Sequence, residues 1–188
     1  MPLPFFTVGH SSRPLDEFLA LLAESEIAVV ADVRRLPGSR AHPHYDGWEL
    51  AAALAEAAVD YVHLPALGGR RSRQRDVPPD KNAYWENTSF HNYADYALGG
   101  DFHAALIELR QLGRERRCAV MCAEAVWWKC HRRIITDYLI AGGETVFHIL
   151  GPGKVEPAHI TAAAHTAPDE RLTYPMPSSA GGNREGFL

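Results

Sequence analysis

The chain has 188 residues, 46% hydrophobic and 22% charged, which is typical of a globular protein with one sizeable core. Its 19 lysines and arginines are outnumbered by 23 aspartates and glutamates, and the resulting net charge of −4 argues against a protein held on nucleic acid mainly by its overall charge. Three cysteines, an odd number, argue against a disulfide framework and favour a reducing cytoplasm.

The start of the chain and the lengths of its apolar runs indicate neither secretion nor a membrane-spanning segment. The first residues, MPLPFFTVGH, lack the basic and long apolar segments of a secretion signal. No apolar run approaches the length of a membrane span. We therefore expect a cytoplasmic protein with no membrane partner.

The first elements along the chain alternate between strand and helix. Residues 5–8 are apolar and predict a buried strand, and residues 15–22 carry apolar side chains every three to four positions, which predicts a helix. Residues 27–33 predict a second strand, apolar along its length as central parallel strands are. An alanine-rich helix over 48–58 and a third strand over 61–64 follow.

A long insertion loop follows the third strand. Residues 65–90 read PALGGRRSRQRDVPPDKNAYWENTSF and show no periodicity. A loop of this length in a compact domain is usually functional or disordered. We expect residues 68–90 to form a lid over a cleft or to be poorly ordered.

The second half of the chain returns to alternation. It predicts helices near 90–98 and 101–113, a strand around 119–121, a helix over 134–141 and a strand over 145–150. The helix over 134–141 would begin near Trp128 or Lys129. Strands that alternate with helices are typical of parallel sheets.

The expected fold class is therefore α/β. We predict one domain over residues 1–173, with a mainly parallel five-stranded sheet and helices on both of its faces. The segment over 174–188, YPMPSSAGGNREGFL, predicts a flexible C-terminal tail.

Polar segments follow four of the predicted strands. These segments are GHSSR (9–13), DVRRLPGSR (32–40), LGGRR (67–71) and CAE (122–124). The carboxyl ends of parallel strands meet at one edge of the sheet, where open α/β sheets bind their ligands. One cleft is therefore expected to be lined by His10, Asp32, Arg34, Cys122, Glu124 and Arg132.

The densest group of reactive side chains lies in MCAEAVWWKCHR, residues 121–132. The helix after it would carry Lys129, His131 and Arg132 in its first turns, with no Ser, Thr, Asp or Asn between 123 and 131 to cap it. A bound anion, either Glu124 or a ligand phosphate, would satisfy both the cations and the free N–H groups. Cys122 beside these groups predicts a thiol with a lowered pKa, exposed to the cleft, whereas Cys118 predicts a buried core residue.

A metal ion is the alternative for the same segment. Cys122, Cys130 and His131 have suitable donor atoms, although their spacing is not one of the usual zinc spacings. The sequence leaves the cofactor and the oligomeric state open.

The chain resembles a bacterial family, the domain of unknown function numbered 488. The blocks that carry the resemblance are TVGHSSRPLDEFLALL, VADVRRLPGSR, YVHLPALGGRR, NYADY, AVMCAEAVWWKCHRRIITDYL and VFHILGPGKVEPAHIT, from residue 7 to about 161. Ala31 and Trp127 depart from the residues common in the family, Val and Pro. The resemblance implies an intracellular α/β domain and leaves the activity open. The family's signature residues carry over to Gly9, His10, Ser11, Asp32, Arg34, Pro37, Gly68, Gly69, Cys122, Glu124, Cys130, His131 and Arg132.

Three hypotheses for the function follow. The first is an enzyme acting on a small anionic, nucleotide-like substrate. Its catalytic residues would be Cys122, Glu124, His10 and Asp32, and its ligand-binding residues Gly9, Ser11, Arg34, Gly68, Gly69, His131 and Arg132. The second is a nucleic-acid-binding or sensing module, in which the arginines at 70–75 contact phosphates while Tyr84 and Trp85 stack on bases. The third is a metal or redox protein that uses Cys122 and Cys130.

Overall fold

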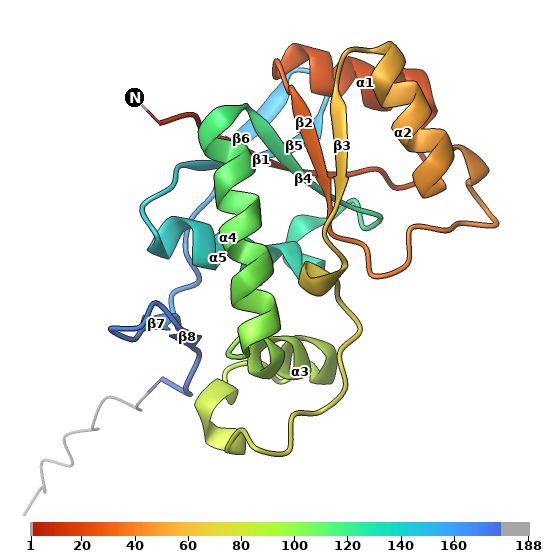
Figure 1. Ribbon diagram of the computed structural model, residues 1–188. Helices are drawn as coiled ribbons and strands as arrows, with labels where there is room; N and C mark the ends of the chain where they lie inside the picture. The colour runs from red at the N-terminus through yellow and green to blue at the C-terminus, as the bar shows by residue number, and fades with distance from the viewer. Residues whose placement is uncertain (1, 178–188) are drawn as a thin grey trace, which may run out of the picture.

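A six-stranded sheet forms the centre of a single α/β domain. In a computed structural model that describes residues 2–177, its strand order is β3-β2-β4-β1-β5-β6 (Figure 1). The strands are β1 (Phe5–Gly9), β2 (Val29–Asp32), β3 (Asp60–His63), β4 (Cys118–Cys122), β5 (Val146–Gly151) and β6 (Lys154–Pro157). The pairs among β1 to β5 are parallel, so the predicted fold class is confirmed.

The sixth strand corrects the predicted number of five. β6 pairs antiparallel with β5 at the edge of the sheet, and its four residues are exposed. Because an exposed edge strand does not need an apolar run, hydrophobic periodicity could not reveal it. Gly153, with a φ of 64°, provides the left-handed conformation in the tight turn between β5 and β6.

Helices cover both faces of the sheet, as predicted (Figure 1). They are α1 (Leu15–Glu24), α2 (Gly47–Glu56), α3 (Thr88–Tyr96), α4 (Gly100–Glu115) and α5 (Arg132–Ala141), with short 3-10 helices η1 (Pro43–Tyr45), η2 (Pro65–Leu67), η3 (Pro79–Asn82) and η4 (Trp127–Lys129). One apolar core packs α1 and α2 on the sheet, and a second packs α3, α4 and α5 on the opposite face. Alternate residues of β2 serve the two cores, with Val30 in the first and Val29 and Ala31 in the second.

The long loop after β3 packs against the C-terminal part of the chain. The Asn82 side chain donates to Asp95, and the backbone N–H of Tyr84 donates to the carbonyl of Tyr174 at 3.0 Å. Tyr174 follows a two-stranded sheet of β7 (His165–Thr166) and β8 (Leu172–Thr173), is fully buried, and donates its hydroxyl to Asp137 at 3.0 Å. The chain is thus packed at residue 174, where the predicted tail begins, and residues 178–188 of that tail lie outside the described residues.

Across residues 2–177, no helix combines the length and the apolar character needed to cross a bilayer.

Candidate functional site

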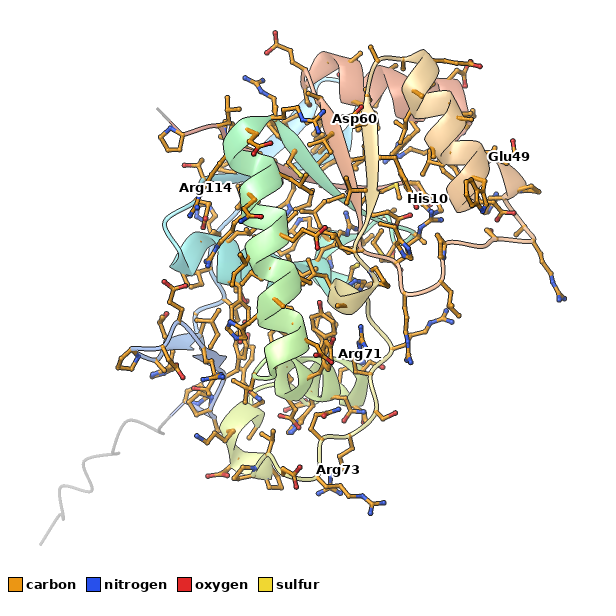
Figure 2. The ribbon with its side chains drawn as sticks, viewed as in Figure 1. His10, Glu49, Asp60, Arg71, Arg73 and Arg114 are labelled. Atoms are coloured by element: carbon orange, nitrogen blue, oxygen red, sulfur yellow. The ribbon has the colours of Figure 1, made fainter. Side chains whose placement is uncertain are left out.

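A cleft of about 910 Å³ opens where the parallel strands end. Four of the six residues predicted to line one cleft do so: His10 after β1, Arg34 after β2, and Cys122 and Glu124 at the end of β4. Gly69, Ser89 and Tyr93, from the long loop and α3, form the facing wall. Figure 2 shows His10 at one end of the sheet and Asp60, the first residue of β3, at the other. The carboxyl edge of the sheet therefore brings these distant segments together.

Asp32 and Arg34 form a buried ion pair behind the cleft wall. Asp32 is fully buried, and its carboxylate accepts hydrogen bonds from Arg34 Nε at 2.9 Å, from Arg34 Nη2 at 2.6 Å and from the Tyr61 hydroxyl at 2.7 Å. Burial and the Asp32 charge raise the pKa of Tyr61, which keeps its proton and donates it. Arg34 also donates to the carbonyl of Tyr45. Asp32 thus holds the guanidinium in place and does not reach the cleft itself.

His10 is buried beside this ion pair. Its Nδ1 donates to the carbonyl of Ser11 at 2.8 Å, and its Nε2 accepts from Arg34 Nη1 at 3.2 Å. The tautomer with its proton on Nδ1 satisfies both contacts. The ring stacks on Tyr45 with the centroids 4.0 Å apart. Burial, with the nearby Arg34 charge, lowers the pKa of His10 to about 4, so the ring is neutral at neutral pH.

Backbone contacts tie the loop after β1 to the end of β4. The N–H groups of His10 and Ser11 donate to the carbonyls of Cys122 and Ala123 at 3.0 and 2.9 Å. Ser11 makes this turn with a φ of 52°, in the left-handed region. Ser11 lines the cleft, although its backbone N–H is already bonded within the protein.

Three glycines allow the loops around the cleft to pack closely. A β-carbon on Gly9 would overlap the Glu124 carbonyl oxygen, and one on Gly68 would come within 2.7 Å of the Arg35 α-carbon. A β-carbon on Gly69 would lie 2.8 Å from His131 Nδ1. Packing therefore requires glycine at all three positions predicted to bind a ligand.

Helix α5 begins at Arg132, later than the predicted start near Trp128 or Lys129. Residues Trp127–Lys129 form the 3-10 helix η4 instead, and the Trp127 ring stacks on His148 with the centroids 4.2 Å apart. Arg132 is 1% exposed and donates to Cys130 Sγ at 3.3 Å and to the carbonyl of Glu124. A sulfur and a carbonyl thus surround this cation, and the Glu124 carboxylate instead accepts the N–H of Val126 at 3.1 Å.

Two cysteines and a histidine meet at the floor of the cleft. Cys122 and Cys130 are 9% and 4% exposed, and their sulfurs and a ring nitrogen of His131 lie within 4.8 Å of one another. His131 Nε2 donates to the carbonyl of Val33 at 3.1 Å, and His131 Nδ1 lies 3.6 Å from Cys130 Sγ. All three residues line the cleft.

The thiol with the lowered pKa is Cys130 and not, as predicted, Cys122. The Cys122 thiol donates to Cys130, which lowers the pKa of Cys130 and raises that of Cys122. Burial further raises the pKa of Cys122, and the Arg132 guanidinium favours the Cys130 thiolate. Cys118 is fully buried, as predicted, and burial raises its pKa to about 12.

Three exposed cations line the cleft that were not among the predicted site residues, although the sequence had placed Lys129 beside a bound anion and Arg70 among the arginines that contact phosphates. Arg35 follows Arg34, Arg70 follows Gly69, and Lys129 precedes Cys130. Each of these cations lies next to a predicted site residue in the sequence, and this position could have placed it at the cleft. Phe90 and Tyr93 also line the cleft, but α3 reaches it only through the tertiary fold.

The stacking role predicted for Trp85 is wrong. Trp85 is 6% exposed and packs against Phe90 and Tyr174 in the core. Arg71, in the arginine-rich segment, lies over the Tyr96 ring at 3.9 Å and donates to two carbonyls of its own loop. Trp85 therefore has no exposed face for a base, and Arg71 helps to hold the loop in place.

Comparison with known proteins gives one match. A family model described as "Domain of unknown function DUF488" matches residues 14–139, which include Asp32, Arg34, Gly69, Cys122 and Cys130. No curated protein and no solved structure matches the chain.

Proposed function

The chain belongs to the DUF488 family, and from the cleft at the carboxyl edge of its sheet we propose that it is an enzyme acting on a small anionic, nucleotide-like substrate. The observation that carries the proposal is the charge around this cleft. Three exposed cations, Arg35, Arg70 and Lys129, border it above a floor that contains two thiols. Thiols, cations and a carboxylate in one concave site are typical of an active site.

An anionic group is the ligand that this border favours. The charge of Arg34 is already balanced by Asp32, which leaves Arg35, Arg70 and Lys129 against the carboxylate of Glu124 among the described lining residues. A single exposed ion pair contributes about 1 kcal/mol or less. Several cations around one concave surface act together, because a cleft focuses their field.

The size and the aromatic wall support a substrate larger than an inorganic anion. The volume of about 910 Å³ lies in the range of about 300–1,000 Å³ that holds small organic ligands. Phe90, which is half-buried, gives one wall an aromatic surface beside the Arg70 cation, whereas the Tyr93 ring is buried behind it. A planar base joined to a phosphate matches both features.

The reacting end of the substrate would lie at the floor, against the two sulfurs. Glu124 is exposed in the cleft and is available to transfer a proton. We assign Asp32 and His10 to positioning, because both are buried and hold Arg34 through hydrogen bonds. This assignment replaces the catalytic roles that the sequence suggested for them.

Binding of AMP and of inorganic phosphate tests the proposal. Titration calorimetry should detect AMP binding, and Arg70→Ala and Lys129→Ala should each weaken it about two- to fivefold, the effect of losing one exposed ion pair. Arg73→Ala and Lys154→Ala are matched controls, because these cations are exposed and lie outside the cleft lining. Equal affinity in all four variants, or no binding of either probe, would contradict the proposal.

A further inference from the structure

The geometry points to a metal site at the floor of the cleft, in which Cys122, Cys130 and His131 bind a thiophilic divalent cation such as Zn²⁺ and leave one coordination position open. This inference deepens the proposed function. The metal site itself depends only on the three side chains. The proposed function enters only in the identity of the group that would fill the open coordination position.

The donor atoms are already close to the spacing that a bound ion requires. Zinc bonds of about 2.3 Å to sulfur and about 2.0 Å to nitrogen, arranged as a tetrahedron, place the ligand atoms roughly 3.5–3.8 Å apart. Cys130 Sγ and His131 Nδ1 are 3.6 Å apart, and the three donor atoms lie within 4.8 Å of one another. A side-chain adjustment of about 1 Å or less would complete the geometry.

Two of the three ligands, His131 and Cys130, have a hydrogen-bond partner that orients them. His131 Nε2 donates to the carbonyl of Val33 at 3.1 Å, which leaves Nδ1 unprotonated and directed at Cys130. The sulfur of Cys130 accepts from Arg132 Nε at 3.3 Å. Such outer partners fix the tautomer of a metal-bound histidine and stabilise metal-bound thiolates.

The ligand types favour zinc over magnesium or calcium. Two thiolates balance the two positive charges of a divalent ion, which leaves the charge of Arg132 beside Cys130. Sulfur and imidazole ligands suit zinc, whereas magnesium and calcium prefer oxygen. Cys118 has no part in this set, because it is fully buried at the opposite end of β4.

The number of protein ligands distinguishes this site from a structural zinc site. Structural sites use four protein ligands, whereas catalytic sites use three and keep a position for water or substrate. The cleft lies over Cys122, Cys130 and His131, so the fourth ligand can come from solvent or from an oxygen of the anionic substrate. A water bound there would become acidic near neutral pH, and Glu124 lines the same cleft as a proton acceptor.

Cobalt and zinc titrations of the reduced, chelator-treated full-length protein test the inference. Co²⁺ should bind at one ion per chain and give the sulfur-to-cobalt charge-transfer band and the strong visible bands of a tetrahedral thiolate site, and Zn²⁺ should displace it. Cys122→Ser, Cys130→Ser and His131→Gln should each weaken binding by at least about 10- to 100-fold, the range seen when even an outer partner is lost. Cys118→Ser is the matched control and should leave the bands unchanged.

Two glycine substitutions test the site in case the ligand variants fail to fold. Gly69→Ala leaves all three ligands present but places a β-carbon 2.8 Å from His131 Nδ1, so it should weaken Co²⁺ binding. Gly100→Ala should not, because its β-carbon would meet no described atom within 4 Å.

Three outcomes would overturn the inference: absence of the charge-transfer band, equal bands in Cys118→Ser and Cys130→Ser, or a Cys122–Cys130 disulfide that forms as readily with Zn²⁺ as without it. AMP titration of the metal-free protein separates this result from the proposed function. Intact AMP binding without metal binding rejects the metal site alone, and metal binding without AMP binding rejects the anionic substrate alone.

Discussion

At the scale of single residues, the polar side chains of the site divide by their position relative to the cleft. Cys122, Glu124 and His131 line it, whereas Asp32 and Arg132 are buried behind it. A buried charge is tolerated only when it is paired and hydrogen-bonded. The buried residues therefore hold the residues that line the cleft in place. Substituting a buried residue should first lower the free energy of unfolding.

Asp32→Asn tests this division. The substitution leaves the Arg34 guanidinium, which is 6% exposed, without its carboxylate, so the free energy of unfolding should fall by about 3–5 kcal/mol. Asp60→Asn removes the carboxylate of an exposed pair with Arg116 and should lower the free energy of unfolding far less, because solvent screens this pair. Urea denaturation measures both. Similar small losses would show that the buried pair contributes little.

At the scale of elements, the long loop after β3 is held by its own arginine. Arg71 Nε donates to the carbonyl of Gly68 at 2.8 Å, and Arg71 Nη2 donates to that of Pro65 at 2.8 Å. The guanidinium also lies over the Tyr96 ring of α3. These contacts place Gly69 and Arg70 at the cleft, where a lid would have to act.

Limited trypsin digestion tests the anchoring of this loop. Arg71→Ala should speed cleavage at the neighbouring arginines, because the loop loses its hydrogen bonds and its cation–π contact. Arg73→Ala also removes one cleavage site, but its side chain is exposed, so it should not speed cleavage elsewhere. Figure 2 shows both side chains on this loop. If the loop is also a lid, AMP should slow the cut in the unmodified protein, and equal rates with and without AMP would argue against a lid.

At the scale of the whole molecule, buried titrating groups couple stability to pH. Burial lowers the pKa of His10 and of His148 to about 4 and raises that of Asp137 to about 6. As the pH falls from 6.5 toward 4, the unfolded chain protonates its histidines before the folded protein does, so stability is lost. Asp137 acts in the opposite direction, because the folded protein takes up its proton first, below about pH 6.

Two substitutions should change this pH dependence with opposite signs. His148→Gln should reduce the loss of stability between pH 6.5 and 4 by about 3 kcal/mol, since the variant no longer has to keep a buried imidazole neutral. Asp137→Asn should make the loss steeper, because it removes the group that offsets it. Urea denaturation at a series of pH values gives both slopes. Parallel curves for the two variants would contradict this account.

The sequence alone determined the fold class and the edge of the sheet at which the cleft opens. Apolar runs such as 27–33 must be buried on both faces, and apolar side chains every three to four residues must form one face of a helix. Both patterns depend on local spacing, so they can be recognised without coordinates. β6 lacked such a signal, because its residues are exposed at the edge.

Only the tertiary structure decided how the site residues divide their roles. Cys122 and Cys130 are eight residues apart in sequence, and the 3-10 helix η4 between them returns the chain so that their sulfurs meet. The contact between the two cysteines lowers the pKa of Cys130 and raises that of Cys122. Burial and charge proximity depend on through-space distances. Those distances are set by how distant segments pack and not by the spacing of residues along the chain.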